Sequence, residues 1–424
     1  MSRSGPLHGE VEAAGSKNAC LPLLAAGLLV DGTARFTRVP RLRDVATLAE
    51  LLTALGCAVS RDAEAGVLAV ATPEAGPTDA PYEIVRRMRA SVCVLGPLLA
   101  RRGLARVPLP GGCVFGPRPV DLHVRGMEAL GAEVRLEHGV LHAQAPPGGL
   151  RGARVDLAGP RGPTVLGTAN VLMAAVLARG ETEIRGAARE PEVVALARWL
   201  RACGARVEGE GGDVLRVQGV AGLRAAPCAM PPDRIETGTL LLAAALTRGR
   251  VRVRGAAPDE LGALLARLEA DGCRVVRDRD GVALDARDAA PRGGEVVTAP
   301  HPGFPTDLQA QWTAYATRSE GETWVRDPIY PERFQHAAEL VRLGADLELA
   351  PGAVRVRGPA RLTGAPVLAS DLRASAALVL AGLVAEGTTV VRRIYHLDRG
   401  YEALERKLGR LGARVLRTVD DQAP

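Results

Sequence analysis

Six segments of the chain share one order of hydrophobic and polar positions. Each has apolar residues at helical spacing, a turn that contains a glycine, and residues of alternating polarity that favour a strand. The turn glycines are 68 to 75 residues apart, and glycine commonly ends a helix. The segments are "LAELLTALGCAV" (48–59), "VRGMEALGAEV" (124–134), "LARWLRACGARV" (196–207), "LLARLEADGCRV" (264–275), "AAELVRLGADL" (337–347) and "LERKLGRLGARV" (404–415).

A second, more apolar helix is predicted before each of these segments. Its residues are mostly Ala and Leu with little polar face, which is typical of a buried helix. In at least four cases a β-rich stretch such as "ARFTRV" or "RVRVRG" links the two helices. The apolar segments are "CLPLLAAGLLVDG", "SVCVLGPLLARRG", "NVLMAAVLARG", "TLLLAAALTRG", "LQAQWTAYATRSEG" and "SAALVLAGLVAEG".

These patterns predict an α/β protein built from six repeats of about 70 residues. A chain of 424 residues exceeds the size at which a single core stops growing, so we expect two domains of three repeats each. A solenoid is the alternative, but solenoid repeats usually run about 20–50 residues. Two pseudo-threefold domains of helices wrapped by sheets fit the pattern better.

Composition narrows the class of protein further. Aromatic residues make up 3% of the chain, and the net charge of +6 comes from basic residues that are spread along it. Both features argue against a nucleic-acid binder, which needs a clustered basic face and stacking side chains. Apolar runs such as residues 21–30 are shorter than the roughly 18–20 residues of a membrane span. With no apolar signal segment in residues 1–15, we expect a cytoplasmic protein without a membrane partner.

The seven cysteines form no C-x-x-C pair, and their number is odd, so neither a zinc site nor a disulfide framework is predicted. Six of them replace apolar residues and are expected to be small buried hydrophobes. Cys113 differs, because Gly111, Gly112 and Gly116 surround it and predict a loop. Cations such as Arg118 favour a thiolate there, so we predict a chemical role for Cys113.

Only Lys17 and Lys407 among the 54 basic residues are lysines. A lysine that persists in so arginine-rich a chain is expected where a compact ammonium is needed. Lys407 lies on what reads as an ordinary charged helix face, whereas Lys17 lies at a turn just before an apolar helix.

Polar and charged residues gather just before the six apolar helices. Ser, Thr, Asp or Asn stands at each expected N-cap, and helix N-termini that share a cleft favour an anion. Lys17, Arg89, Arg118 and Arg399 add cations that bind phosphate and carboxylate, so we predict an anionic small-molecule substrate. The helix starts are "GSKN" (15–18), "RRMRAS" (86–91), "PTVLGTAN" (163–170), "PPDRIETG" (231–238), "HPGFPTDLQ" (301–309) and "LASDLRAS" (368–375).

Asp307, in "HPGFPTDLQAQ", is the candidate general base of such a cleft, with a helix N-cap as the alternative role. His123 and His301 are further candidate bases.

Eight motifs then occur in order over nearly the whole chain: "GSKNA", "MRAS", "LPGGCVFGPRPVDLH", "AAREPEVV", "PDRIETGT", "TAPHPGFPTDLQAQ", "DLRASAALVLAG" and "RIYHLDRGYE". Together they resemble the UDP-N-acetylglucosamine enolpyruvyl transferases (1-carboxyvinyltransferases) of bacterial cell-wall synthesis. The Gly-Gly-Cys and Arg-Pro-Val-Asp-Leu-His strings are the most specific of them. The related shikimate-pathway enzymes share the fold but are not known for this cysteine loop.

The resemblance implies a two-domain inverse α/β barrel with the active site in the interdomain cleft. Residues 18–231 would form the domain with the cysteine loop, and residues 1–17 with 232–424 would form the second. The implied reaction moves the enolpyruvyl group of phosphoenolpyruvate to the 3′-hydroxyl of the sugar nucleotide and releases phosphate, the first committed step of peptidoglycan synthesis. It implies no metal and no cofactor, and it leaves the oligomeric state open.

The resemblance also implies roles for individual residues. Cys113 would supply the acid of the addition and elimination and could form an adduct with the enolpyruvyl carbon, and Asp307 would be the base. Lys17, Asn18, Arg118 and Arg399 would bind phosphoenolpyruvate, Lys17 and Arg399 with catalytic roles, while Asp371, Arg373 and His123 would support the site. The uridine nucleotide would contact Arg89, Arg118, Pro119, Val120, Asp121, Leu122, Gly162, Pro163, Thr164, Val165, Asp307 and Ile329.

Two substrate-contact segments depart from the family pattern. "GPTVLGT" (162–168) replaces Ser-Val-Gly-Ala-Thr and has Gly162 where a lysine is usual, and "YPERF" (330–334) replaces Phe-Glu-Asn-Arg-Phe. These departures keep open a paralogue that acts on UMP or another uridine nucleotide in nucleoside-antibiotic synthesis. A non-enzymatic anion or nucleic-acid binder is the remote alternative. A pseudoenzyme is disfavoured because Cys113, Lys17 and Asp307 are all present.

Overall fold

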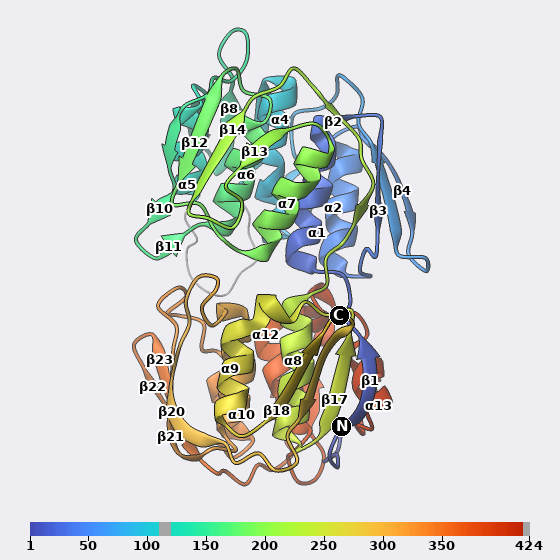
Figure 1. Cartoon of the computed structure of the whole chain (residues 1–424), viewed down its shortest axis with the longest axis vertical. Coiled ribbons are helices and arrows are strands. Elements are labelled where there is room, and N and C mark those ends of the chain that lie inside the picture. Colours follow the sequence, from blue (N-terminus) through green and yellow to red (C-terminus); the bar gives the residue numbers. More distant parts are fainter. Residues whose placement is uncertain (110–119, 419–424) are drawn as a thin grey trace. The chain divides into compact units, whose positions relative to one another are not determined.

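The computed structural model describes residues 1–109 and 120–418, and the chain divides into two compact units (Figure 1). One unit is residues 15–231, and the other joins residues 1–14 to residues 232–424. Residues 15–17 fold with the first unit rather than with the second. The reason is local: the hydroxyl of Ser16 accepts a hydrogen bond from Ala19 N at 3.3 Å and so caps the helix that begins at Lys17.

In unit 15–231, helices alternate with short strands. The helices are α1 (Lys17–Ala26), α2 (Arg43–Ala54), α3 (Tyr82–Val85), α4 (Leu95–Arg102), α5 (Asp121–Ala129), α6 (Val165–Ala175) and α7 (Pro191–Ala202), with 3₁₀ turns η1 (Gly27–Leu29) and η2 (Arg89–Val94). The strands are β2 (Val30–Asp31), β3 (Thr33–Thr37), β4 (Ala58–Asp62), β5 (Val67–Ala71), β6 (Leu104–Pro108), β7 (Glu133–Glu137), β8 (Val140–Gln144), β9 (Arg154–Asp156), β10 (Ala158–Gly159), β11 (Gly162–Pro163), β12 (Glu181–Arg185), β13 (Arg206–Glu208), β14 (Val214–Gln218), β15 (Leu223–Arg224) and β16 (Cys228–Ala229).

Two sheets of this unit have the same pairing. β16 pairs parallel with β3, which continues antiparallel into β5 and β4. β9, β12, β14 and β13 repeat that order. β6, β8 and β7 form the antiparallel part alone, with a parallel bridge from Asp79 to Arg106 on β6.

The other unit is built in the same manner. Its helices are α8 (Arg234–Leu246), α9 (Gly262–Ala270), α10 (Gln309–Ala316), α11 (His336–Arg342), α12 (Leu372–Gly382) and α13 (Leu404–Arg410), with 3₁₀ turns η3 (Pro258–Leu261), η4 (Thr306–Leu308) and η5 (Ile394–Arg399). Its strands are β1 (His8–Glu12), β17 (Arg250–Arg254), β18 (Arg274–Asp278), β19 (Gly281–Asp285), β20 (Arg292–Val297), β21 (Glu320–Arg326), β22 (Asp346–Ala350), β23 (Ala353–Gly358), β24 (Pro366–Leu368) and β25 (Val390–Arg392).

Its sheets pair β1 parallel with β17, β20 parallel with β21, and β24 parallel with β25. The first two continue into antiparallel hairpins, in the orders β1-β17-β19-β18 and β20-β21-β23-β22. Because β1 comes from the N-terminal segment, the start of the chain is an integral strand of the unit that contains residues 232–424.

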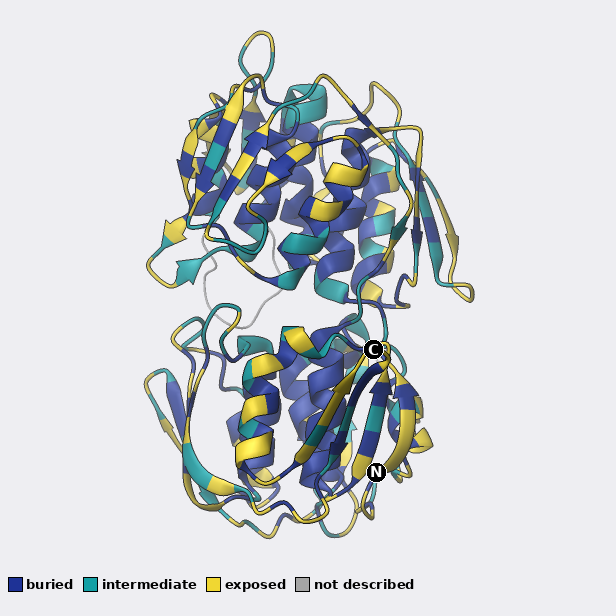
Figure 2. Ribbon diagram, viewed as in Figure 1, coloured by how far each residue is buried: buried dark blue, intermediate teal, exposed yellow. Residues whose placement is uncertain are grey.

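The apolar helices are buried, as their composition predicts (Figure 2). All residues of α8 are buried, as are those of α6 beyond its first two positions. The six turn glycines have φ between 85° and 104°, in the left-handed region that ends a helix and that glycine enters without a Cβ clash.

One expected strand is missing from the described residues. Residues 413–418, which follow α13, form no strand, although the sixth segment predicts one. Arg414 instead bonds to the N-terminal segment, through its carbonyl to Ser2 N at 3.1 Å and through its N–H to the Ser4 hydroxyl at 3.1 Å.

Candidate active site

The start of α1 holds Lys17 in a buried ion pair. Lys17 Nζ lies 2.9 Å from Asp44 Oδ2, in the first turn of α2, and the two side chains are 11% and 4% exposed. Asn18 is half-buried on the same turn of α1. Asp44 was not among the residues predicted from the sequence. It fixes the ammonium at the positive end of a helix, where anions are favoured.

His123 is a buried residue of α5 that belongs to a structural network. Asn170 accepts from Gly96 N at 2.9 Å through its amide oxygen, so its Nδ2 can only donate to His123 Nδ1, 2.9 Å away. The imidazole is therefore neutral with its proton on Nε2, and burial lowers the pKa of His123 to about 4. Through this hydrogen bond His123 joins α5 to α6.

Other predicted nucleotide contacts cluster at the starts of α5, η2 and α6. Val120 is the N-cap residue of α5, Asp121 is exposed at its first position, and Leu122 is buried. Arg89 begins η2 and is half-buried. A Cβ built on Gly159 would lie 3.0 Å from Leu122, so the β10–β11 hairpin packs on the start of α5.

Residues 162–165, which depart from the family pattern, form β11 and the start of α6. Gly162 has φ +93° in the hairpin, a conformation that disfavours the lysine usual at this position. Pro163 completes β11, and the hydroxyl of Thr164 caps α6 by accepting from Gly167 N at 3.2 Å. Val165 is half-buried as the first residue of α6. Cys113, Arg118 and Pro119 lie outside the described residues.

In the other unit, two arginines bracket the carboxylate of Asp307. Arg333 Nη1 donates to Oδ1 at 2.8 Å and Arg373 Nη2 donates to Oδ2 at 2.7 Å. The side chains of Asp307, Arg333 and Arg373 are 24%, 8% and 3% exposed. Burial raises the pKa of Asp307, but the two guanidinium groups outweigh it and hold that pKa well below its usual range.

Polar side chains of α10, α12 and the segment between η5 and α13 complete this centre. Arg373 Nη1 donates to the Tyr401 hydroxyl at 3.1 Å, and its guanidinium lies over the Tyr401 ring, 5.5 Å from the centroid. Gln311 Nε2 donates to the same hydroxyl at 2.9 Å and to the Asp307 carbonyl at 3.0 Å. Arg333, Gln311 and Tyr401 were missed from sequence. Only their places in "YPERF", "TDLQAQ" and "DRGYE" could have signalled them.

Asp327 organises the turn that carries Ile329. This buried carboxylate accepts from Ile329 N at 3.0 Å and from the hydroxyl of Thr306 at 2.5 Å, next to Asp307 in the chain. Ile329 is half-buried, so the predicted sugar-pocket residue and the predicted base are positioned by one side chain.

The remaining predicted residues of this unit are Asp371, Arg399 and His301. Asp371 caps α12 by accepting from Arg373 N at 2.8 Å and Ala374 N at 3.1 Å. Arg399 ends η5 and is half-buried, and His301 is half-buried on the loop before η4.

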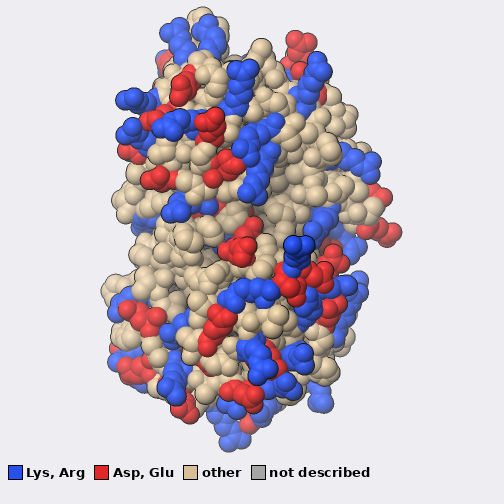
Figure 3. All heavy atoms as spheres, viewed as in Figure 1, with Lys and Arg blue, Asp and Glu red and all other residues tan. Residues whose placement is uncertain are grey.

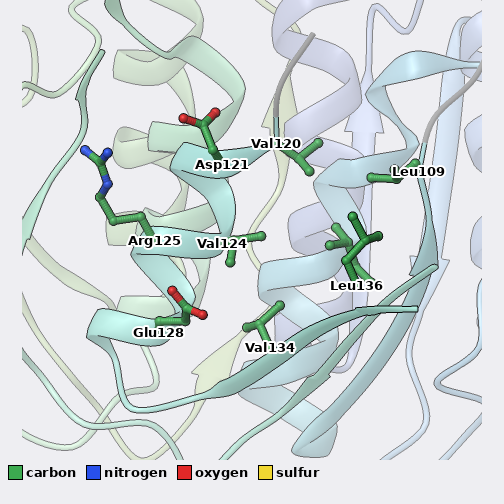
Figure 4. Close-up of a pocket in the computed structure, with 9 residues that line it drawn as sticks. Leu109, Val120, Asp121, Val124, Arg125, Glu128, Val134 and Leu136 are labelled. Atoms are coloured by element: carbon green, nitrogen blue, oxygen red, sulfur yellow. The ribbon is translucent and has the colours of Figure 1, made fainter. Parts of the chain in front are cut away.

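A hollow lies beside α5 in unit 15–231 (Figure 4). Its wall is largely apolar, and Asp121, Arg125 and Glu128 lie on its α5 side. Leu109 and Val120 on its rim border the part of the chain that is not described. The other lining residues are Val124, Val134, Leu136 and Leu141.

Several classes of site find no support in residues 1–109 and 120–418. No group of three or more His, Cys, Asp or Glu side chains there could hold a metal ion. No helix of that part of the chain is both long and apolar enough to cross a bilayer. Lys, Arg, Asp and Glu are interspersed over the face shown in Figure 3, without a continuous basic patch.

Comparison with known proteins defines the class first. The family model described as EPSP synthase (3-phosphoshikimate 1-carboxyvinyltransferase) matches residues 1–408. Two curated relatives are named UDP-N-acetylglucosamine 1-carboxyvinyltransferase. The one from Nitratidesulfovibrio vulgaris (strain Hildenborough) is 50% identical over 98% of each chain, and the one from Anaeromyxobacter sp. is 51% identical over 97% of each. The chain therefore belongs to the EPSP synthase family of enolpyruvyl transferases and, within it, to the UDP-N-acetylglucosamine 1-carboxyvinyltransferases.

Solved structures agree on the fold. The enolpyruvyl transferase NikO from Streptomyces tendae matches with a TM-score of 0.87 at 26% identity over 97% of each chain. EPSP synthase from Acinetobacter baumannii matches with a TM-score of 0.74 at 17% identity over 97% of each chain, a likeness of fold alone.

Proposed function

We propose that this enzyme transfers the enolpyruvyl group of phosphoenolpyruvate to the 3′-hydroxyl of UDP-N-acetylglucosamine and releases phosphate, in the cytoplasm and without a cofactor. The observation that carries the proposal is the identity of 50–51% along 97–98% of the chain to proteins that bear this substrate's name. The identity to the enolpyruvyl transferase NikO is 26%, about half as high, so these relatives favour UDP-N-acetylglucosamine over another acceptor.

The transfer has two stages with opposite proton movements. In the addition, the sugar hydroxyl gives up its proton as its oxygen bonds to C2 of phosphoenolpyruvate, and C3 receives a proton. In the elimination, C3 loses a proton, the double bond returns, and the C2–O bond to phosphate breaks. The site therefore needs an acid, a base and cations that stabilise a carboxylate and a phosphate.

We assign the base to Asp307. While Arg333 and Arg373 both bind its carboxylate, Asp307 is a weak base, because the two guanidinium groups stabilise its anion. Arg373 Nε is buried and has no hydrogen-bond partner among the described residues, so one donor of this guanidinium group is unused in this arrangement. We propose that phosphoenolpyruvate draws these guanidinium groups towards its own charges, so that the pKa of Asp307 rises when the substrate is present.

The other roles follow from the resemblance and the geometry within each unit. Lys17, Asn18, Arg118 and Arg399 bind phosphoenolpyruvate, and Cys113 supplies the acid. Asp371 and His123 hold α12 and α5 in place, and Arg373 holds Asp307. Arg89, residues 118–122, residues 162–165 and Ile329 bind the uridine nucleotide.

Phosphate release from phosphoenolpyruvate, measured in parallel with UDP-N-acetylglucosamine and with UMP, tests the proposal. We expect release with the sugar nucleotide and none above background with UMP. Release with UMP alone would overturn the assigned acceptor, and release with neither would overturn the transferase assignment. Cys113→Ser should lose most turnover and Cys113→Asp should keep a larger part, since a carboxyl group can also carry the proton. A fully active Cys113→Ser variant would contradict the role of the thiol.

We also propose that the fold is an inverse α/β barrel of six related repeats, three in each unit. The recurring parallel-then-antiparallel order of β16-β3-β5-β4, β9-β12-β14-β13, β1-β17-β19-β18 and β20-β21-β23-β22 supports this proposal.

A further inference from the structure

Lys407 and Glu236 form a buried ion pair at the start of α8. Lys407 Nζ, on α13, lies 2.8 Å and 2.7 Å from the two carboxylate oxygens of Glu236. The side chains are 17% and 1% exposed. The expectation of an ordinary charged helix face for Lys407 is therefore wrong, because its ammonium binds a carboxylate of the core.

The same carboxylate holds the backbone at the point where the chain leaves this unit. Glu236 Oε2 accepts from Ala14 N at 2.7 Å, and Ala14 O accepts from Asp233 N at 2.8 Å. Ala14 is the last residue of the unit's N-terminal segment, and the chain enters unit 15–231 at Gly15. Both polar backbone groups of Ala14 are thus fixed by the first residues of α8.

The next three residues are held just as closely. Ser16 N donates to Pro231 O at 2.7 Å, and the Ser16 hydroxyl caps α1. A Cβ on Gly15 would lie 2.1 Å from the Arg38 carbonyl oxygen, so the backbone at Gly15 has no room to shift in that direction. Lys17 follows directly, in its pair with Asp44. Because Ala14 is bonded directly to Gly15, loosening Ala14 removes one of the restraints on the short segment that leads into the first turn of α1.

The composition points to the same residues. The only two lysines of the chain, Lys17 and Lys407, each pair with a buried carboxylate, and a single Lys407 nitrogen serves both oxygens of Glu236. A compact ammonium reaches this geometry, whereas a planar guanidinium needs two nitrogens and more space.

We propose that Glu236 and Lys407 are positioning residues of the transfer reaction, which fix Ala14 and, through residues 14–16, the ammonium of Lys17. This inference rests on the proposed function, in which Lys17 binds phosphoenolpyruvate. Lys407 supplies a positive charge that offsets the burial of the Glu236 carboxylate, and Glu236 supplies the acceptor for Ala14 N–H.

The test combines amide hydrogen exchange with steady-state kinetics of the full chain. Glu236→Ala removes the acceptor of Ala14 N–H, Lys407→Met removes the charge, and Glu236→Gln keeps an acceptor. In the first two variants we expect the amides of Ala19 and Cys20, which bond to Ser16, to exchange about tenfold faster. The KM for phosphoenolpyruvate should rise about tenfold, with less than about a twofold change in the KM for UDP-N-acetylglucosamine. Glu236→Gln should be intermediate in both measurements.

Val354→Ala is the matched control, since it removes fully buried methyl groups from β23 of the same unit. It should lower thermal stability without changing exchange at residues 14–20 or either KM. The inference would be overturned if the amides of residues 14–20 exchanged at the same rate in Glu236→Ala and Lys407→Met as in Val354→Ala. Faster exchange with an unchanged KM for phosphoenolpyruvate would overturn it as well, because the link to Lys17 would be absent. If the wild type released no phosphate, the proposed function would fail, while the exchange result would still decide whether the pair holds α1.

Discussion

Arg373 donates a hydrogen bond from Nη2 to Asp307 Oδ2 at 2.7 Å, and this pair, together with Arg333, sets the charge of the candidate base. The arginines are almost fully buried, whereas the carboxylate keeps a quarter of its surface exposed. A buried cation is stable only while its partner is ionised, so Asp307 has a structural as well as a chemical role.

Replacing Asp307 by Asn should therefore impair both activity and folding. We expect phosphate release to fall about 10²- to 10⁴-fold, as for loss of a general base. The free energy of unfolding should fall by about 3–5 kcal/mol, because two buried guanidinium groups lose their counter-charge. Asp278→Asn is the control, since Asp278 pairs with Arg252 on the surface and should change stability by less than about 1 kcal/mol. If urea denaturation gave equal losses of unfolding free energy for Asp307→Asn and Asp278→Asn, the structural role of Asp307 would be contradicted.

The same carboxylate predicts a pH dependence of stability. Its pKa is depressed in the folded protein, so the unfolded chain binds the proton first as the pH falls. The stabilisation is complete above about pH 4, the ordinary range of an aspartate, and is lost as the pH falls further. Urea denaturation at pH 7, 5, 4 and 3 should show a constant gap between wild type and Asp307→Asn down to about pH 4 and a narrowing gap below it. A gap that stays constant to pH 3 would show that the arginines do not depress this pKa.

His123 predicts a second acid-sensitive step, in unit 15–231. Burial lowers its folded pKa to about 4, while the unfolded histidine titrates near 6.5. Stability should fall between about pH 6.5 and 4, because only the unfolded chain binds a proton there, by up to about 3 kcal/mol. His123→Asn keeps an acceptor near Asn170 Nδ2 and should lose stability less steeply than the wild type over this range. A slope from His336 of the other unit should persist, because burial lowers the pKa of His336 to about 4 as well. A wild type and variant that lose stability in parallel over this range would refute the neutral buried imidazole.

Lys17→Met should cost stability as well as substrate binding. Its removal leaves Asp44 buried without its ammonium partner, which we expect to lower the free energy of unfolding by about 3–5 kcal/mol. The double variant Lys17→Met with Asp44→Asn should recover part of that stability but not the activity, since the cation for phosphoenolpyruvate is still absent. Thermal denaturation measures the stability of the variants, and phosphate release measures their activity. Recovery of activity in the double variant would argue against the role of Lys17.

Gly15→Ala should destabilise the point where the chain passes from one unit to the other. The new Cβ would lie 2.1 Å from the Arg38 carbonyl oxygen, a backbone atom that cannot move aside without strain. We expect a loss of about 1–3 kcal/mol or more, as for overpacking. Gly222→Ala, in the same unit, meets its nearest atom at 3.7 Å and should be neutral to within about 0.5 kcal/mol. Similar melting temperatures for the two variants would contradict this close approach.

Much of the fold could be predicted from the sequence, because the features concerned depend on residues close together in the chain. The glycine turns after α2, α5, α7, α9, α11 and α13 follow from residue type and spacing, and so do the buried faces of α6 and α8. The missing strand at residues 413–418 shows where local preference stops being sufficient, because Arg414 bonds to the N-terminal segment instead of to a neighbouring hairpin strand.

Part of the candidate site could likewise be predicted from the sequence, and part could not. Lys17 and Asp307 stand out as charged residues at helix starts, and the motifs around them carry the family resemblance. Sequence position could not say that Asp44 pairs with Lys17, because the two residues lie on different helices.

The sequence by itself determined the repeat pattern, the family and the residue types available for chemistry, since each of these depends on neighbours along the chain. Only the tertiary structure decided their charge states and partners. The basicity of Asp307 depends on Arg333 and Arg373, 26 and 66 residues away in the chain. Lys407 reaches Glu236 across 171 residues. Electrostatic interactions act through space and strengthen with burial, so a carboxylate that reads as an ordinary base in the sequence becomes a suppressed one when folding places two buried cations beside it.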